Sequence, residues 1–277
     1  TRKESSAASD VYKRQFHGYD IDLILRRADL ALYQAKRDGR SCVRQYSDEM
    51  DMLARARTVL ELDVREAVDR RLFYLDYQPI INAVDGEVAG YEALLRWRTA
   101  TGQMVPPSVF IPVVEDLGLI FALGEWVLRS ACSEAMRWSH NIYVSVNVST
   151  AQLTDPTFVG IVDEILSDTG LAPERLELEI TESMVLDNVV IAEGILRTLR
   201  NHGIGIALDD FGTGFSSLSL VKKLPLTRIK IDKSFVDQIG DDGKSTAVID
   251  AVLALCDGHG LSTCLLYTSP SPRDLST

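Results

Sequence analysis

The sequence predicts an α/β barrel, and three observations favour this fold class. Short apolar runs with strand character alternate with amphipathic helical patterns from residue 72 onward, which is typical of repeated βα units and a parallel sheet. The repeat provides about seven strands, which favours a (β/α) barrel over a doubly wound open sheet. No G-x-G-x-x-G motif follows an early strand, which argues against a dinucleotide-binding fold.

Composition limits the classes of function and partner. The chain has 277 residues, of which 46% are hydrophobic and 25% charged, and its formal net charge is −11. This charge leaves no basic surface for binding DNA or RNA in bulk. The 4 cysteines form no C-x-x-C pair, so neither a zinc site nor a disulfide framework is indicated. No apolar run reaches the length of a membrane span, and we expect a cytoplasmic protein.

Isolated elements, rather than a domain, precede the barrel. Residues 1–15 show no periodicity and are expected to be a tail. A helical pattern over residues 21–37 is followed by a candidate short strand at 42–46. One helix and one strand cannot enclose a core, so this piece is an appendage or the end of a mostly missing domain. A charged amphipathic helix over residues 54–71 is expected to lead into the barrel.

The barrel elements follow in order, separated by proline and glycine. Strands are predicted at residues 73–81, 88–97, 142–149, 176–181, 204–208, 228–231 and 261–266. Helices are predicted at residues 107–117, 121–139, 155–169, 189–201, 216–224 and 245–257. A short turn at Asp85-Gly86 joins the first two strands, which predicts a hairpin and therefore an antiparallel pair. The three tryptophans are expected to pack helices against the barrel.

Polar residues interrupt five of the apolar strands near their carboxyl ends. They are Glu92, Asn147, Glu179, the adjacent pair Asp209 and Asp210, and Lys230. In a barrel these strand ends converge on one mouth. Oxygen donors without Cys or His are typical of an Mg²⁺ or Mn²⁺ site, and the set favours two-metal hydrolysis of a phosphate ester. Lys230 would neutralise phosphate charge or hold the attacking water. The alternative is a buried ion pair between Lys230 and a carboxylate.

Three local motifs carry less information. Asp210 begins the kinase tripeptide D-F-G, but the other kinase motifs are absent. The G-T-G sequence at 212–214 is interpreted either as a phosphate-binding loop or as a tight turn. Arg96 is a candidate phosphate clamp, although a single arginine is more often solvated.

Six segments together resemble the EAL-domain family, which comprises cyclic di-GMP phosphodiesterases with a modified TIM-barrel fold. They are Y-Q-P at 77–79, E-A-L-L-R-W at 92–97, Asn147, E-I-T-E at 179–182, D-D-F-G at 209–212 and K-I-D at 230–232. Their order and spacing agree with the family from residue 54 to residue 263. The resemblance implies hydrolysis of one phosphodiester bond of cyclic di-GMP, which gives linear pGpG. It also implies a homodimer formed through this domain.

The resemblance assigns a role to each site residue. The residues implied to bind one metal ion are Glu92, Asn147, Glu179 and Asp209, with Asp210 serving the second ion. Lys230 is implied to contact the catalytic water, and it forms the catalytic group together with Glu92 and Asp210. The implied substrate contacts are Gln78, Leu94 and Arg96. Glu182 is implied to stabilise the loop after Asp210, which in this family couples metal binding to dimerisation.

The beginning of the chain resembles a different domain. The sequence A-D-L-A-L-Y-Q-A-K at 28–36, followed by Gly39-Arg40, resembles the last helix and strand of a GGDEF (diguanylate cyclase) domain. The cyclase motif itself is absent, so no cyclase activity is implied. We expect a parent protein with tandem GGDEF and EAL domains behind an upstream sensor. The expected divisions are a tail (1–15), a GGDEF remnant (16–50), a linker helix (51–71), the EAL domain (72–263) and a second tail (264–277).

The chain departs from the family after Thr263. The family continues with a strand resembling A-E-G-V-E, whose first glutamate belongs to the metal site, whereas Leu266 stands at about that place here. We interpret residues 5–15 and 264–277 as non-native sequence flanking a gene fragment, because neither fits a periodic element. A barrel without its last strand has unpaired edges. We therefore expect this chain to be unstable or aggregating and to have little activity, and its parent to be active.

Three hypotheses of function follow. The first is a metal-dependent cyclic di-GMP phosphodiesterase, and the second is a non-enzymatic receptor for the same dinucleotide. Inactive members of such families usually lose metal ligands, whereas this chain retains all of those within its length, which favours the enzyme. A purely structural barrel is the third hypothesis, and it leaves the polar strand ends unexplained.

Overall fold

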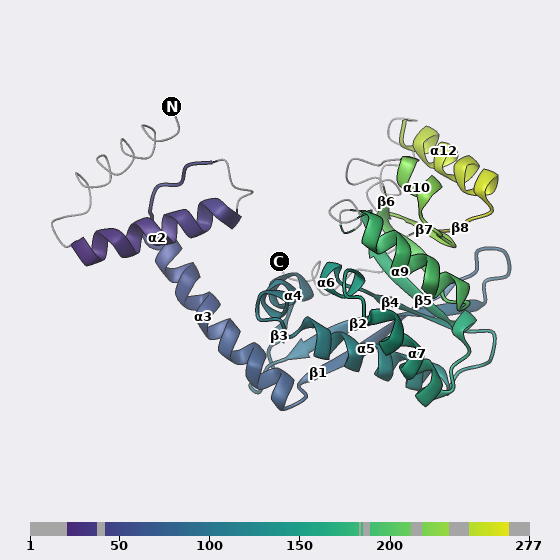
Figure 1. Ribbon diagram of the computed structural model, residues 1–277, viewed down its shortest axis with the longest axis horizontal. Coiled ribbons are helices and arrows are strands. Elements are labelled where there is room, and N and C mark those ends of the chain that lie inside the picture. Colours follow the sequence, from purple (N-terminus) through teal and green to yellow (C-terminus); the bar gives the residue numbers. More distant parts are fainter. Residues whose placement is uncertain are drawn as a thin grey trace. The chain divides into compact units, whose positions relative to one another are not determined.

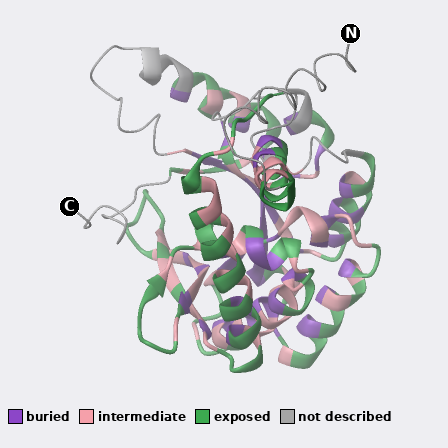
Figure 2. Ribbon diagram, turned by 90° about the vertical axis from the view of Figure 1, so that its left-hand side faces the viewer, coloured by how far each residue is buried: buried purple, intermediate pink, exposed green. Residues whose placement is uncertain are grey.

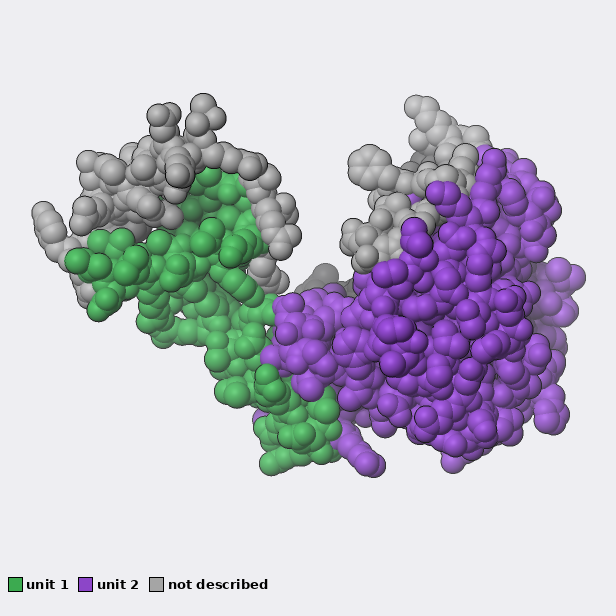
Figure 3. Space-filling view, in the orientation of Figure 1, with its two compact units in different colours: residues 1–70 green, residues 71–277 purple. Residues whose placement is uncertain are grey.

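A computed structural model describes residues 21–37, 42–182, 184, 189–211, 218–232 and 244–265. It divides the chain into two units, residues 1–70 and 71–277, which Figure 3 colours separately. We describe each unit by itself. The predicted tail at 1–15, the G-T-G turn at 212–214 and residues 266–277 of the second predicted tail lie outside the described residues.

The described part of the first unit contains two helices. They are α2 (Ile21–Arg37) and α3 (Asp48–Asp69), and Arg26 of α2 forms an ion pair with Asp51 of α3 at 3.0 Å. Helix α3 begins six residues before the predicted start at 54, directly after Ser47 in extended conformation. Acidic residues fill its first turn, where negative charge interacts favourably with the helix dipole.

The candidate strand at residues 42–46 is wrong. These residues have no regular secondary structure. A strand needs a neighbour for its backbone hydrogen bonds, and the described part of the first unit contains no second strand. Tyr46 instead lies under the guanidinium of Arg27, 4.8 Å from the ring centre. Whether residues 16–50 derive from a GGDEF domain stays a prediction.

The second unit is built on one curled sheet (Figure 1). Its strands are β1 (Phe73–Ile81), β2 (Val88–Arg98), β3 (Met104–Val105), β4 (Tyr143–Asn147), β5 (Leu176–Thr181), β6 (Gly205–Phe211), β7 (Arg228–Ile231) and β8 (Ser262–Leu265). The order is β1-β2-β4-β5-β6-β7-β8, with β3 paired to β2. Strand β1 is antiparallel to β2, and the pairs from β2–β4 to β7–β8 are parallel. This half-barrel with an antiparallel first strand confirms the predicted fold class.

The hairpin between β1 and β2 forms where the sequence places it. Gly86 has φ +76°, a conformation that glycine adopts without steric cost, and its amide donates to the carbonyl of Asn82 at 2.9 Å. The pairing then sets Gln78 opposite Glu92. The turn therefore sets the register of the hairpin, and the register decides which β1 residue lies beside Glu92.

Helices cover the outer face of the sheet (Figure 1). They are α4 (Pro107–Asp116), α5 (Ile120–Ala135), α6 (Thr150–Leu153), α7 (Phe158–Thr169), α9 (Val189–Asn201), α10 (Leu218–Lys223) and α12 (Lys244–His259), with a short 3₁₀ helix η1 (Pro173–Arg175). Buried positions, purple in Figure 2, lie on the strands and on the helix faces turned toward them. Among the described residues, no helix is both long enough and apolar enough to cross a bilayer.

The core lies between this outer face and the helices. Alternate strand residues such as Val144, Leu178 and Ile229 are almost fully buried and form one cluster with apolar residues of α5, α7 and α9. Side chains alternate between the two faces of a strand. The polar residues of the same strands must therefore point to the inner face.

Aromatic residues pack helices and strands together, as the sequence predicts. Trp97 is 1% exposed and meets Phe110 of α4 edge-on, with ring centres 5.6 Å apart. Trp138 lies against Tyr77 and Tyr91 of the hairpin, at 5.3 and 4.7 Å. Helix α5 ends at Ala135 rather than at the predicted residue 139, which leaves Trp138 in the turn from which it makes these contacts.

Candidate functional site

Strand register places the predicted polar residues side by side on the inner face. Glu92 of β2 pairs with Ser145 of β4, and Asn147 pairs with Glu179 of β5. Residues paired across adjacent strands point to the same side of the sheet. The register thus brings together Glu92 and Ser145, which are 53 positions apart along the chain, and Asn147 and Glu179, which are 32 positions apart.

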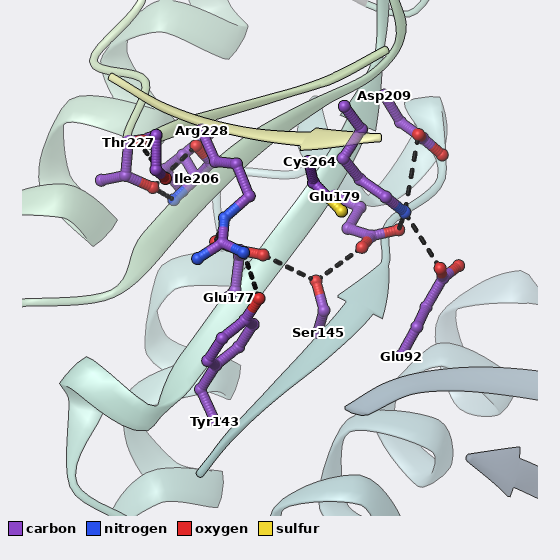
Figure 4. A network of polar contacts seen from close by, with 12 residues as sticks. Glu92, Tyr143, Ser145, Glu177, Glu179, Ile206, Asp209, Thr227, Arg228 and Cys264 are labelled. Carbon is purple, nitrogen blue, oxygen red and sulfur yellow. Dashed lines mark hydrogen bonds and ion pairs between the residues drawn. The ribbon is translucent and has the colours of Figure 1, made fainter. Parts of the chain in front are cut away.

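Lys230 lies among the carboxylates of this face. Figure 4 shows the three carboxylates, which belong to Glu92, Glu179 and Asp209. The Lys230 ammonium Nζ is 2.8 Å from Glu179 Oε2, 3.0 Å from Glu92 Oε2 and 3.5 Å from Asp209 Oδ1. The side chain is 2% exposed, so solvent screens these charges little. Asn147 Nδ2 donates to the other oxygen of Glu92 at 3.0 Å. Five of the predicted site residues thus form one contiguous cluster.

Burial and charge shift the pKa values of the cluster. Burial raises the pKa of Glu179, of Asp209 and of Asp210, and neighbouring carboxylates raise them further. Burial lowers the pKa of Lys230, but the surrounding carboxylates outweigh this effect and raise it overall, so the ammonium keeps its proton. Three carboxylates share this one ammonium, and the ionised cluster therefore retains excess negative charge.

A β-bulge aims the two adjacent aspartates. Ala207 and Leu208 pair with successive residues of β7, but the next paired residue of β6 is Phe211, so Asp209 and Asp210 both stand opposite Lys230. Asp210 has φ +55°, a left-handed conformation that aspartate tolerates better than most residues. The extra residue breaks the strand alternation. Burial raises the pKa of Asp210, Asp232 and Glu92 raise it further, and Lys230 lowers it. Strand β6 continues through Phe211, so the predicted end at residue 208 is wrong.

The predicted substrate contacts lie beside the cluster on the hairpin. Gln78 pairs with Glu92, and Leu94 and Arg96 follow Glu92 on the same face of β2. Arg96 Nε forms an ion pair with Asp76 Oδ2 at 3.0 Å, and its Nη1 donates to the carbonyl of Leu95 at 3.1 Å. Asp76, which sequence reasoning missed, therefore holds the guanidinium.

Glu182 follows β5 directly and is 5% exposed. Residues 212–217 of the loop that it is predicted to stabilise lie outside the described residues. The proposed coupling of this loop to dimerisation stays a prediction.

A second polar layer lies beneath the site, and sequence reasoning missed it. Ser145 Oγ lies 2.6 Å from Glu179 Oε1 and 3.1 Å from Glu177 Oε1. Glu177 Oε2 forms an ion pair with Arg228 Nε at 3.1 Å, and the Arg228 guanidinium donates to the Tyr143 hydroxyl and lies over its ring at 4.6 Å. Figure 4 shows both layers. The available signal was the i,i+2 spacing of charges in L-E-L-E and R-I-K.

The metal-ligand role of the carboxylates is not visible directly. In the part of the chain that the structure describes, no group of three or more His, Cys, Asp or Glu side chains has the geometry of a metal site. The Lys230 ammonium lies among the carboxylates instead. The structure therefore contains the buried ion pair between Lys230 and carboxylates that the sequence analysis gave as the alternative. Metal binding stays a prediction.

Comparison with known proteins identifies the family. Residues 61–266 match the EAL domain. The chain belongs to the EAL-domain family. It is 47% identical over 238 residues to an uncharacterised signalling protein of Caulobacter vibrioides, covering 86% of this chain and 29% of that protein. It is 36% identical over 236 residues to MucR of Pseudomonas aeruginosa, a bifunctional diguanylate cyclase/cyclic di-GMP phosphodiesterase, covering 84% of this chain and 34% of MucR.

Solved structures agree with this assignment. The EAL domain resembles the MucR phosphodiesterase in complex with c-di-GMP, with a TM-score of 0.71 and 35% identity over 78% of this chain and 89% of that one. It also resembles an EAL enzyme in its cAMP- and cyclic-di-GMP-bound form, with a TM-score of 0.74 and 28% identity over 93% of this chain and 69% of that one. The predicted family is therefore confirmed. The chain spans about a third of the length of MucR.

Proposed function

We propose that this EAL domain hydrolyses cyclic di-GMP to linear pGpG with Mg²⁺ or Mn²⁺, as an active enzyme in the parent protein and with little activity in this chain. One observation carries the proposal: three carboxylates from three strands surround a buried lysine on the inner face of the sheet, and an amide from a fourth strand binds one of these carboxylates. The homologous MucR domain is a phosphodiesterase that binds c-di-GMP. A purely structural barrel has no need for excess negative charge in its interior.

The residues present fit a divalent cation. Asp209 Oδ1 is buried and makes no hydrogen bond among the described residues. Its ion pair with Lys230 Nζ is long, at 3.5 Å, so this oxygen can still bind a further cation. Asn147 donates through Nδ2 to Glu92, so its carbonyl oxygen stays available as a ligand. Carboxylate and amide oxygens suit Mg²⁺ and Mn²⁺.

The predicted ligand set is Glu92, Asn147, Glu179 and Asp209 for one ion, with Asp210 serving the second. When bound, the ions would supply an activated water and a Lewis acid for the phosphate.

The protein groups around this position have separate tasks. Lys230 has a raised pKa, so it is a hydrogen-bond donor rather than a base, and it holds the attacking water and offsets phosphate charge. Arg96 is oriented by Asp76 through Nε and by the Leu95 carbonyl through Nη1, and we assign its Nη2 to a phosphate oxygen. Gln78 and Leu94 line the same face and contact the nucleotide.

The wider predictions also stay proposals. Residues 16–50 are the end of a GGDEF domain, the EAL domain forms a homodimer, and the protein is cytoplasmic. Analytical ultracentrifugation of the purified chain with and without Mn²⁺ tests the dimer, because the family resemblance links dimerisation to the metal site.

Turnover of cyclic di-GMP tests the proposed function. The purified chain is incubated with cyclic di-GMP and Mg²⁺ or Mn²⁺, and pGpG is measured by chromatography. Glu92→Ala is expected to abolish turnover. The matched control is Glu87→Ala, because Glu87 is an exposed glutamate in the turn of the same hairpin. Circular dichroism checks that each variant is folded.

A non-enzymatic receptor for cyclic di-GMP is the second candidate, because the Lys230 ammonium lies among the predicted metal ligands. Tight binding of cyclic di-GMP by a folded chain, without pGpG formation in either metal, would replace the enzyme with the receptor. Calorimetry of the same samples makes this distinction.

A further inference from the structure

Ser145 occupies a special position in the inner face. It is the middle residue of β4, it is 0% exposed, and register places it between Glu92 on one side and Glu177 on the other. Its hydroxyl faces two carboxylates, at 2.6 Å from Glu179 Oε1 and 3.1 Å from Glu177 Oε1. Packing alone does not require a serine here, because alanine or valine would fill the same strand position. The hydroxyl therefore matters for its hydrogen bonds to the two carboxylates.

The two contacts are not equivalent. A serine hydroxyl has one proton, so it can donate to only one carboxylate at a time. The 2.6 Å contact to Glu179 has the length of a charge-assisted bond, whereas the contact to Glu177 is longer. Glu177 also has Arg228 as a partner for its other oxygen. The hydroxyl therefore serves Glu179 first.

Both oxygens of the Glu179 carboxylate are thereby fixed. Oε1 accepts from Ser145 on β4, and Oε2 accepts from Lys230 on β7 at 2.8 Å. Two donors on the strands that flank β5 and β6 set the rotation of the carboxylate plane. Neither donor belongs to the strand that carries Glu179.

The layer beneath provides a firm support for Ser145. Arg228 joins Glu177 to the Tyr143 ring, and glycines leave room for this layer. A Cβ on Gly90 would lie 2.7 Å from the Tyr143 ring, and one on Gly205 would lie 3.4 Å from Glu177. The lower layer is tightly packed around the Tyr143 ring, which limits how far the Glu177–Arg228 pair beside Ser145 can shift.

We propose that Ser145 is a positioning residue for Glu179. Its hydroxyl holds the carboxylate in the orientation that binds the metal ion, and it connects the site to the Glu177–Arg228 ion pair below. The inference rests on the proposed function, because it takes Glu179 as a metal ligand. Loss of a hydrogen-bond partner behind a metal ligand typically weakens metal affinity about 10–100-fold.

Metal titration of the folded chain tests this role. Mn²⁺ binding is followed by the electron paramagnetic resonance signal of the free ion, for wild type, Ser145→Ala and Ser145→Thr. The alanine variant is expected to bind Mn²⁺ at least about tenfold more weakly, and the threonine variant, which restores the hydroxyl, is expected to recover most of the affinity. Ser145→Cys, with a similar volume and only a weak donor, gives the same comparison if the alanine variant does not fold.

Val146→Ala is the matched control. Val146 is the next residue of β4, 1% exposed on the opposite face, so its truncation destabilises the core without touching Glu179. It is expected to lower the unfolding temperature while keeping wild-type Mn²⁺ affinity. Equal affinity of wild type and Ser145→Ala would overturn the inference alone. Absence of Mn²⁺ binding by the folded wild type would overturn the proposed metal-dependent function, and this inference with it.

Discussion

Replacing Lys230 by methionine tests the central interaction of the site. The ammonium lies within 3.5 Å of three carboxylates, and the side chain is 2% exposed. Methionine fills nearly the same space, but it leaves the carboxylates without their shared cation. Removing one partner of a buried ion pair costs about 3–5 kcal/mol, because the remaining charge is uncompensated. We expect the free energy of unfolding of Lys230→Met near neutral pH to fall by about that amount.

The loss should depend on pH in one direction. Burial raises the pKa of Glu179 and of Asp209 in the folded chain. A carboxyl with a raised pKa stabilises the fold while it is protonated, and this contribution is lost as the pH rises through its folded-state pKa. Without Lys230, which opposes the increase, both pKa values go higher. The variant should therefore regain part of its stability when the pH is lowered from about 8 to about 5.

Urea unfolding followed by tryptophan fluorescence measures this effect. The control is Lys222→Met, because Lys222 is an exposed lysine of α10, and surface substitutions usually change stability by less than about 0.5 kcal/mol. Wild-type stability of Lys230→Met near pH 8 would show that the carboxylates do not need the ammonium. A loss of the same size at both pH values would show that packing, rather than charge, is responsible.

Substitutions at three other positions test separate features. Asp76→Asn removes the charge that orients Arg96. This half-exposed pair contributes only about 0–1 kcal/mol to stability, so we expect an unchanged unfolding midpoint. The KM for cyclic di-GMP should rise about fivefold, which corresponds to about 1 kcal/mol. Asp210→Gly and Asp210→Val both remove the carboxylate, but only valine resists φ +55°, so the valine variant should be about 1–2 kcal/mol less stable in urea unfolding. Gly90→Ala forces a Cβ to within 2.7 Å of the Tyr143 ring, and such overpacking should cost about 1–3 kcal/mol by the same measurement.

Each of these predictions has a result that contradicts it. Gly160→Ala is the control for Gly90→Ala, since a Cβ on Gly160 meets nothing within 4 Å and alanine favours the helix. Equal stability of the two alanine variants would argue against tight packing under the site. Equal stability of the two Asp210 variants would show that the bulge carries no strain. An unchanged KM for Asp76→Asn would argue against Arg96 as a phosphate contact.

The sequence predicts the parts of this fold that depend on local patterns. Strand and helix order follows from alternating apolar runs, and the turn at Asp85-Gly86 correctly predicts an antiparallel first pair. The cluster around Lys230 follows from polar residues at strand ends, because barrel topology brings such ends together. These inferences need only periodicity and chain order.

Features that depend on three-dimensional partners were missed. The candidate strand at 42–46 has suitable residues but no neighbouring strand in the described part of its unit. The bulge at Asp209 and Asp210 arises from pairing with β7, which no local pattern reveals. Ser145 is an ordinary serine in the sequence, and its role depends on two carboxylates of β5.

The two polar layers also determine how the strands can align. Arg228 and Lys230 alternate with Ile229 and Ile231, which are 0% and 1% exposed in the opposite, helix-covered face. A slip of β7 by one residue would turn both cations into the apolar core and both isoleucines toward the acids. Misaligned sheets are thereby heavily penalised, even if their backbone hydrogen bonds are complete. The charges inside this half-barrel therefore favour one alignment of β7 with its neighbouring strands during folding, before any ligand is present.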